Sequence, residues 1–170
     1  MKEALIIPRE VARVVGVLHG AGFEAHPVGG CVRDLLLRHP PTGGPHDWDI
    51  TTSAHPEDIL ALFRESFYEN AFLTVTVKTE SDDPALKEIE ITTFRAEGRY
   101  TDKRHPDEVR YAKTLEEDLS RRDFTCNAIA IALPNFQLVD PFQGQKDIKK
   151  KLIRAVGNPD ERFDEDALRM

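Results

Sequence analysis

Along the chain, the spacing of apolar residues changes between that of helices and that of strands. Between residues 8 and 21, apolar side chains recur every three or four positions, which predicts a helix with one buried face. Apolar faces also predict helices over residues 31–38 and 56–64, and we expect further helices over 115–121, 145–151 and 160–170. Short runs rich in Val, Ile and Thr, or with alternating polarity, predict strands over residues 23–28, 47–50, 72–78, 86–94, 128–133, 137–140 and 152–156.

Polar residues indicate where two of these helices begin. Thr52 or Ser53 is expected to cap the helix that follows them. Thr114, with Glu117 three residues later, has the spacing of a capping box. Both helix starts are therefore predicted from side-chain chemistry as well as from periodicity.

Two stretches without such periodicity are predicted to be loops. Residues 39–46 contain three prolines and two glycines, which interrupt helices and strands. Residues 95–113 are polar and charged, and they are too long for an ordinary connection. We expect this second stretch to form a flexible, basic loop beside the functional site.

Length and composition indicate a soluble protein with one main domain. The 170 residues suffice for one domain, or for one domain with the beginning of a second, and 40% of them are hydrophobic. No segment approaches the ~20 apolar residues that span a bilayer, so we expect no association with membranes. The two cysteines, Cys31 and Cys126, indicate no disulfide framework, which fits a cytoplasmic setting.

The formal net charge of −7 argues against a general nucleic-acid-binding surface. It does not exclude a nucleic acid that is held locally, because carboxylates that bind metal ions make a site acidic. Basic residues also cluster in 95–104 and 146–154, and a polyanion would meet these patches first. For any single lysine, a solvated surface position is the alternative.

Residues 28–34 have the pattern of a strand end, a Gly-Gly turn and a helix start. Gly29 and Gly30 let the backbone turn tightly and approach a ligand closely. A helix that begins near Cys31 directs its free N–H groups into this gap, which favours a phosphate group. The alternative is that the two glycines only separate a strand from a helix.

Asp47 and Asp49 are two residues apart on a predicted strand, so their carboxylates are expected on one face. A hard divalent cation between them would relieve their repulsion, and Mg²⁺ is the natural candidate. Alternation places Glu88 and Glu90 on one face of another predicted strand, which could supply Glu90 as a third carboxylate. Solvent exposure is the alternative for all four side chains. A phosphate site followed by metal-binding carboxylates indicates phosphoryl or nucleotidyl transfer.

Arg121, Arg122 and Asp123 directly precede an apolar run. The arginines could bind a triphosphate and the aspartate a ribose hydroxyl. By itself, this motif is more often a salt-bridged helix end.

Glu165, Asp166 and Arg169 project from one side of the last predicted helix. The alternative is a surface ion pair between them, which would stabilise the helix by ~0.2–0.5 kcal/mol. Because a helix of two turns without a packing partner is marginally stable, we expect the chain to be the front part of a longer protein.

Four motifs, over residues 29–34, 47–49, 121–128 and 165–169, together resemble the class II tRNA nucleotidyltransferases. These are the CCA-adding enzymes, to which the bacterial poly(A) polymerases are closely related. The resemblance implies an α/β (α+β) fold of the polymerase-β nucleotidyltransferase type, with a mixed sheet flanked by helices. It also implies a catalytic head domain over 1–157 and the truncated start of a helical neck over 158–170.

The resemblance implies a role for each matching residue. Asp47 and Asp49 would bind metal in a two-ion Mg²⁺ site and would form the catalytic carboxylates together with Glu90. The glycines and Arg33 would hold the triphosphate, residues 121–123 would recognise the ribose, and residues 165–169 would pair with the base edge of CTP or ATP. The residues implied in nucleotide binding are Gly29, Gly30, Arg33, Asp34, Arg121, Arg122, Asp123, Asn127, Glu165, Asp166 and Arg169.

The implied function is template-independent addition of C and A, from CTP and ATP, to the 3′ end of tRNA. Residues 95–113 correspond to the family's flexible loop, and their full length argues against an enzyme that adds C only. The neck, body and tail domains of a longer protein would bind the tRNA. Addition of all three nucleotides and addition of the final A alone both remain open.

Two other functions are alternatives. A bacterial poly(A) polymerase, which adds AMP to RNA 3′ ends, shares all of these motifs. A nucleotide-binding module without catalysis is the second alternative, and the retention of Asp47, Asp49 and Arg33 argues against it.

Overall fold

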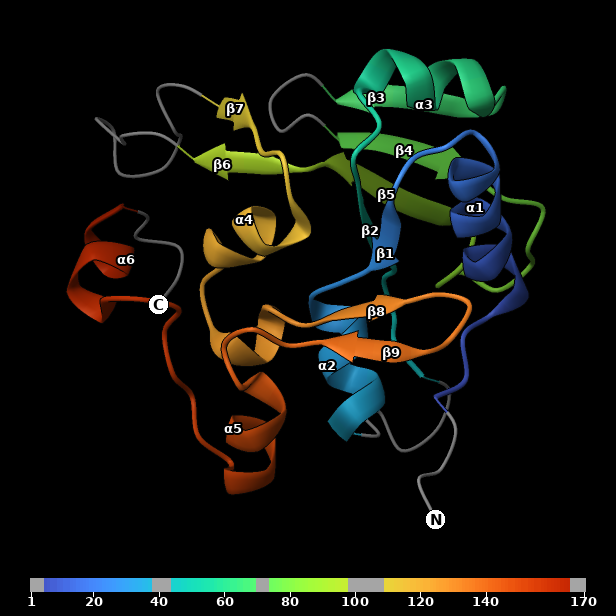
Figure 1. The fold of residues 1–170 in the computed structure, drawn as a ribbon. Helices are drawn as coiled ribbons and strands as arrows, with labels where there is room; N and C mark the ends of the chain where they lie inside the picture. The colour runs from blue at the N-terminus through green and yellow to red at the C-terminus, as the bar shows by residue number, and fades with distance from the viewer. Residues whose placement is uncertain (1–4, 38–43, 70–73, 98–108, 166–170) are drawn as a thin grey trace.

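The computed structural model describes residues 5–37, 44–69, 74–97 and 109–165, which are built around a five-stranded mixed sheet (Figure 1). Adjacent strands follow the order β1 (Ala25–Pro27), β2 (Asp49–Thr52), β5 (Glu88–Thr93), β4 (Thr74–Lys78) and β3 (Ser66–Glu69). β2 and β5 are parallel, and the other neighbouring pairs are antiparallel. The expected mixed sheet is therefore confirmed.

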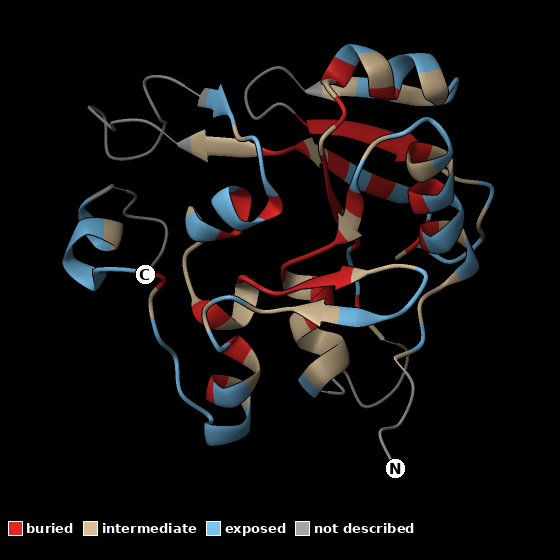
Figure 2. Ribbon diagram, in the orientation of Figure 1, coloured by how far each residue is buried: buried red, intermediate tan, exposed pale blue. Residues whose placement is uncertain are grey.

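Two helices, α1 (Arg9–Gly20) and α3 (Pro56–Leu62), contact each other and pack against this sheet. The apolar face of α1 meets the inward-facing isoleucines of β5 in the main core. β5 alternates between buried and more exposed positions (Figure 2), so Glu90 and Thr92 lie on the opposite face from this core. One face of β5 therefore packs in the apolar core, and the other face carries polar side chains.

Besides this sheet and its two helices, the described chain forms α2 (Gly30–Leu37), β6 (Arg95–Glu97), β7 (Val109–Tyr111), α4 (Leu115–Ser120), the 3₁₀ helix η1 (Thr125–Asn127), β8 (Ala130–Ala132), β9 (Gln137–Val139), α5 (Gly144–Lys150) and α6 (Pro159–Glu165). β8 packs beside β1, and α2, η1 and α5 contact one another next to this hairpin. Around buried Phe94, a second apolar cluster includes Leu115 and Leu119 of α4. In the described part of the chain, no helix is long and apolar enough to cross a bilayer.

The predicted N-cap of α4 is confirmed, but the second hydrogen bond of the predicted capping box is made to a different residue. The hydroxyl oxygen of Thr114 accepts a hydrogen bond from the backbone N–H of Glu117 at 3.2 Å. The Glu117 carboxylate in turn accepts from the backbone N–H of Lys113 at 2.7 Å, one residue before the position that a standard capping box uses.

The predicted start of α3 at Pro56 is confirmed, but its predicted cap is wrong, because His55 occupies the N-cap position instead of Thr52 or Ser53. Thr52 and Ser53 instead connect β2 to the residue before β1. The Thr52 hydroxyl donates to the carbonyl oxygen of Glu24, and the Ser53 hydroxyl accepts from the Glu24 backbone N–H. Both side chains that could have capped the helix therefore form hydrogen bonds with the backbone of Glu24 instead.

The strands differ from the prediction in three places. The predicted strand over 152–156 is absent, and only an isolated bridge joins Ala155 to Phe124, because this stretch follows a left-handed Lys151 and is largely exposed. The edge strand β3 was not predicted. The predicted loop over 95–113 begins and ends in the hairpin strands β6 and β7, whereas residues 98–108 lie outside the described residues.

Gly144 at the start of α5 provides a test of packing against η1. A Cβ atom on Gly144 would lie 2.0 Å from the Thr125 carbonyl oxygen, whereas a Cβ on Gly16 in α1 would meet nothing within 4 Å. We expect Gly144→Ala to lower the free energy of unfolding by about 2 kcal/mol or more. Gly16→Ala is the matched control and is expected to raise it by about 0.5–1 kcal/mol. Urea denaturation of both variants measures the difference, and a stable Gly144→Ala protein would contradict this packing.

Candidate active site

The parallel pairing of β2 with β5 brings the predicted carboxylates together. Asp49, the first residue of β2, lies in register with Glu90 of β5. Asp47 is exposed and lies in a bend before β2, so the prediction that both aspartates share one strand is wrong. Asp47, Asp49 and Glu90 nevertheless line one hollow of about 200 Å³. Glu88 lines the same hollow, which agrees with its predicted place on the Glu90 face.

Asp47 and Asp49 are the residues that could hold a metal ion. Within the described ranges, no three His, Cys, Asp or Glu side chains are arranged to hold one by themselves. Mg²⁺ does not require such a cage, since it usually keeps several waters and binds one or two carboxylates together with substrate phosphates. The pair of carboxylates therefore fits Mg²⁺ better than it fits an ion that needs a complete protein cage.

Asp49 carries an electrostatic cost in the folded protein. Burial raises the pKa of Asp49 above its ordinary value. The charge of Arg122 opposes this rise, and the charge of Asp47 adds to it. A cation bound next to Asp49 would favour the ionised form of this carboxylate and lower its pKa.

The predicted Gly-Gly turn is present between β1 and α2. Gly29 has a φ of +80°, a left-handed conformation that other residues rarely adopt. A Cβ atom there would lie 2.9 Å from Nη1 of Arg122 and 3.8 Å from a carboxylate oxygen of Asp49. α2 begins at Gly30, one residue earlier than predicted. Glycine is therefore required here by backbone conformation and by the close approach of two predicted site residues.

A chain of hydrogen bonds joins α2 to the segment that follows α4. Arg33 donates from Nε to Asp34 and from Nη1 to the side-chain oxygen of Asn127, each at 2.8 Å. The Asn127 amide donates to Asp123 at 3.0 Å. Four of the predicted nucleotide-binding residues thus form one network, in which Asn127 connects the predicted triphosphate and ribose groups.

A second hollow, of about 280 Å³, adjoins the carboxylates. Asp49 and Glu90 line it on one side, and three arginines, Arg95, Arg121 and Arg122, also contribute to its lining. Such a set of cationic groups next to carboxylates can bind phosphate beside a metal ion. Arg95 was not singled out from the sequence, where it lay in the predicted loop.

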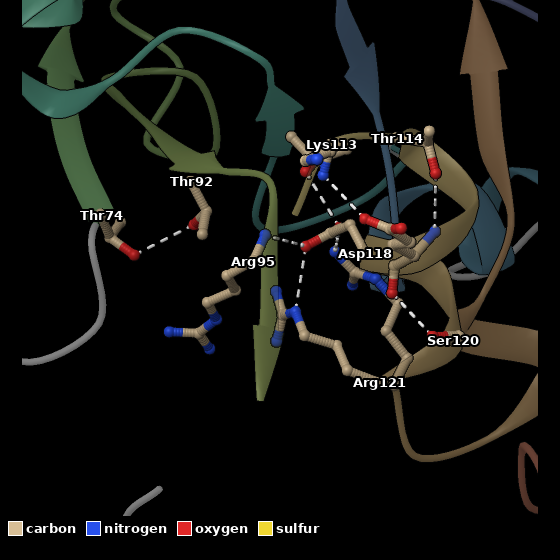
Figure 3. Close-up of polar contacts among 11 residues, drawn as sticks. Thr74, Thr92, Arg95, Lys113, Thr114, Asp118, Ser120 and Arg121 are labelled. Carbon is tan, nitrogen blue, oxygen red and sulfur yellow. Dashed lines mark hydrogen bonds and ion pairs between the residues drawn. The ribbon is translucent and has the colours of Figure 1, made fainter. Parts of the chain in front are cut away.

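Asp118 in α4 is a second residue that sequence reasoning missed. Its side chain is completely buried, and it forms ion pairs with Arg121 and Arg122 (Figure 3 shows Asp118 and Arg121). Burial acts to raise the pKa of Asp118, but the charges of the two arginines and the hydrogen bonds outweigh it, so the pKa lies below its ordinary value. Its spacing of three and four residues from the arginines was the available signal.

The predicted base-recognition residues lie at the limit of what the structure describes. The backbone of Glu165 ends α6. Asp166 and Arg169 lie outside the described residues, as does the side chain of Glu165. Their role stays a prediction.

Comparison with known families gives one match over most of the chain. Residues 25–154 match the family described as the Poly A polymerase head domain. Among curated proteins, the chain is 51% identical over 161 residues to the CCA-adding enzyme of Lactobacillus helveticus, covering 92% of this chain and 37% of that enzyme. The chain spans less than two-fifths of the length of the curated relatives it matches.

Solved structures give the same family relationship. The crystal structure of the Bacillus stearothermophilus CCA-adding enzyme in complex with CTP matches with a TM-score of 0.81 and 38% identity, covering 96% of this chain and 38% of that one. A tRNA nucleotidyltransferase complexed with a primer tRNA and an incoming ATP analogue matches with a TM-score of 0.69 and 30% identity, covering 92% of this chain and 42% of that one.

The raised pKa of Asp49 predicts a pH-dependent stability. A carboxyl group whose pKa is raised by folding stabilises the folded state most below its unfolded pKa, near 4, and this contribution is lost as the pH rises through the folded value. In the absence of divalent cations, we expect Asp49→Asn to raise the melting temperature at pH 7 by about 2–4 °C for each 1 kcal/mol of relieved cost.

Thermal denaturation between pH 4 and pH 8 measures this effect. Asp47→Asn is the matched control, and it should change the melting temperature less because Asp47 is exposed. A lower melting temperature of Asp49→Asn at pH 7 would mean that Asp49 forms a net stabilising ion pair.

Proposed function

Because the chain belongs to the Poly A polymerase head domain family, we propose that it is the catalytic head of a tRNA nucleotidyltransferase. The proposed reaction is template-independent addition of C and A, from CTP and ATP, to the 3′ end of tRNA. The observation that carries this proposal is the pairing of Asp49 with Glu90 at a hollow that three arginines also line. The relatives named above are CCA-adding enzymes, which supports this function over poly(A) synthesis.

Asp47 and Asp49 are proposed to hold Mg²⁺, with Glu90 as the third carboxylate of the catalytic group. When bound in a two-ion site, Mg²⁺ would lower the pKa of the tRNA 3′-hydroxyl and stabilise the pyrophosphate leaving group. The raised pKa of Asp49 supports this assignment, because a nearby cation would compensate the cost of ionising a buried carboxylate.

The protein's own groups would orient the nucleotide. The turn at Gly29 and Gly30 lets phosphate oxygens approach the backbone, and Arg33 would supply positive charge. Asp123 would accept a hydrogen bond from the ribose hydroxyl of the incoming nucleotide. Its carboxylate is held by Asn127 and by the backbone N–H of Phe124 at 2.6 Å, which supports a fixed orientation.

Base selection is proposed to depend on Glu165, Asp166 and Arg169. Hydrogen-bonding groups that fit only the correct base edge discriminate strongly, because a wrong base leaves buried polar groups unpaired. Residues 1–157 would form the head, and residues 158–170 would begin a helical neck. The tRNA is proposed to be bound largely by neck, body and tail domains like those that the family resemblance implies.

Asp47→Asn and Asp49→Asn test the catalytic assignment. Each is expected to lower the rate of nucleotide incorporation by about 10³-fold or more, because a lost metal ligand removes several kcal/mol of transition-state stabilisation. Labelled CTP and ATP are offered, with Mg²⁺, to tRNA transcripts that lack CCA or end in C or CC. Circular dichroism confirms that each variant is folded. Retained incorporation by either variant would remove that residue from catalysis, and long A tails on unrelated RNA would indicate a poly(A) polymerase.

Arg169→Ala tests the proposed base recognition. We expect the preference for CTP and ATP over UTP and GTP to fall by about 10-fold or more, since the lost guanidinium no longer pairs with the base edge. Competition assays with all four nucleotides measure this preference. Arg162→Ala, a matched change in α6, should leave the preference intact. Unchanged selectivity of the Arg169 variant would contradict its role.

A further inference from the structure

The Asp118 carboxylate lies where three parts of the fold meet. It belongs to α4, its side chain has no exposed surface, and its contacts reach β2, the first residue of β6 and the two arginines that follow α4. Figure 3 shows the carboxylate between the backbone nitrogen of Arg95 and the side chain of Arg121.

Each oxygen of this carboxylate accepts two hydrogen bonds. One oxygen accepts from Nε of Arg121 at 2.9 Å and from the backbone N–H of Arg95 at 3.2 Å. The other accepts from the hydroxyl of Thr51 at 3.0 Å and from Nη2 of Arg122 at 3.5 Å. A carboxylate offers about four acceptor sites, so this arrangement uses them fully.

The contact with Thr51 connects the Asp118 carboxylate, and through it the two arginines, to β2, the strand that carries Asp49. Thr51 is two residues beyond Asp49 in β2, so its side chain lies on the same face as that of Asp49. A hydrogen bond from this hydroxyl therefore sets how far the heads of Arg121 and Arg122 lie from the Asp49 carboxylate. Both arginines and Asp49 line the 280 Å³ hollow.

The guanidinium of Arg122 lies at a longer distance from Asp118, with 3.5 Å between Nη2 and the carboxylate oxygen. The Arg122 side chain is 17% exposed, and within the described residues its Nε is buried without a hydrogen-bond partner. Its Nη1 lies 2.9 Å from the place where a side chain on Gly29 would begin. Loss of Asp118 would remove its contact with this guanidinium, whose position would then be limited by the glycine turn and by the charge of Asp49.

We propose that Asp118 is a positioning residue for nucleotidyl transfer, which holds Arg121 and Arg122 at the required distance from the carboxylates of β2 and β5. It does not contact the reacting atoms and acts through the two guanidinium groups. The inference rests on the proposed function and adds to it a residue outside the four motifs. A purely stabilising ion pair is the competing explanation.

A double-mutant cycle separates positioning from stability. Asp118→Asn keeps the shape of the side chain and removes its charge. We expect it to lower kcat/KM for CTP and ATP by about 100-fold, as is typical when a binding group is displaced by about 1 Å. In an Arg121→Ala background, the same change should cost clearly less, because one of the two groups that it positions is already gone. If the loss of kcat/KM in the double variant equals the product of the losses in the two single variants, the proposal is overturned.

Asp147→Asn is the matched control for burial and charge. Asp147 is equally buried and accepts from the hydroxyl of Thr125 at 2.7 Å and from Arg154 at 2.8 Å. Its replacement should lower the melting temperature in a similar way to Asp118→Asn. The fold losses in kcat/KM of Asp147→Asn and Arg121→Ala should multiply in the double variant. In these hydrogen bonds, neither residue contacts the partners of the other.

A measurement without catalysis distinguishes failure of this inference from failure of the proposed function. The Nε–H of Arg121 should give a slowly exchanging ¹⁵N NMR signal, assigned by its loss in Arg121→Lys. In Asp118→Asn, hydrogen exchange of this group should become about 10-fold faster or more, since the hydrogen bond is lost. If the wild-type chain incorporates no nucleotide but the signal responds, the positioning contact holds and catalysis by this chain alone is contradicted. An unchanged signal in Asp118→Asn overturns the positioning role.

Discussion

The parallel register between β2 and β5 is the constraint on which the site depends. It places Asp49 beside Glu90 on one face and Ile50 beside Ile91 on the other. Because the side chains of a strand alternate, a shift by one residue would move the carboxylates toward the core and the isoleucines toward the solvent. Packing of α1 against the apolar face therefore maintains the geometry of the polar face.

Two aspartates on this polar face, half-buried Asp49 and buried Asp118, experience opposite electrostatic environments. The pKa of Asp49 is raised by burial, with a contribution from Asp47. The pKa of Asp118 is lowered despite burial, because two arginines and several hydrogen bonds favour its charged form. Asp118 is thus compensated within the protein, whereas Asp49 is left with a cost that a bound cation would relieve. This difference separates a positioning group from a candidate metal ligand.

Long-range side-chain bonds turn separate sequence motifs into one site. Arg33 and Asn127 are 94 residues apart and are joined at 2.8 Å. Asn127 also holds Asp123, so the orientation of the proposed ribose acceptor depends on α2 as well as on its own segment. Gly144 contributes indirectly, since only a glycine there lets α5 approach Thr125 in η1. The nucleotide-binding residues are therefore supported by packing at a distance from the carboxylates.

Local patterns in the sequence were sufficient for the elements whose signals lie within a few residues. The periodicity of α1 and the Thr114 cap of α4 are examples, and the order of the motifs indicated the family before the sheet was known. Predictions were wrong where a distant partner decided the outcome. Thr52 and Ser53 bond to Glu24 instead of capping α3, and the apolar stretch over 152–156 finds no strand to pair with.

Residue type and spacing alone indicate which carboxylates, glycines and arginines are available for a site. The folded chain was needed to show that Asp49 lies beside Glu90, that Arg95 lines the hollow, and that Asp118 contacts both arginines. These relations depend on strand register and on burial, which involve residues far apart in the chain. No local pattern contains them, since the free energy that fixes them arises when the elements pack together.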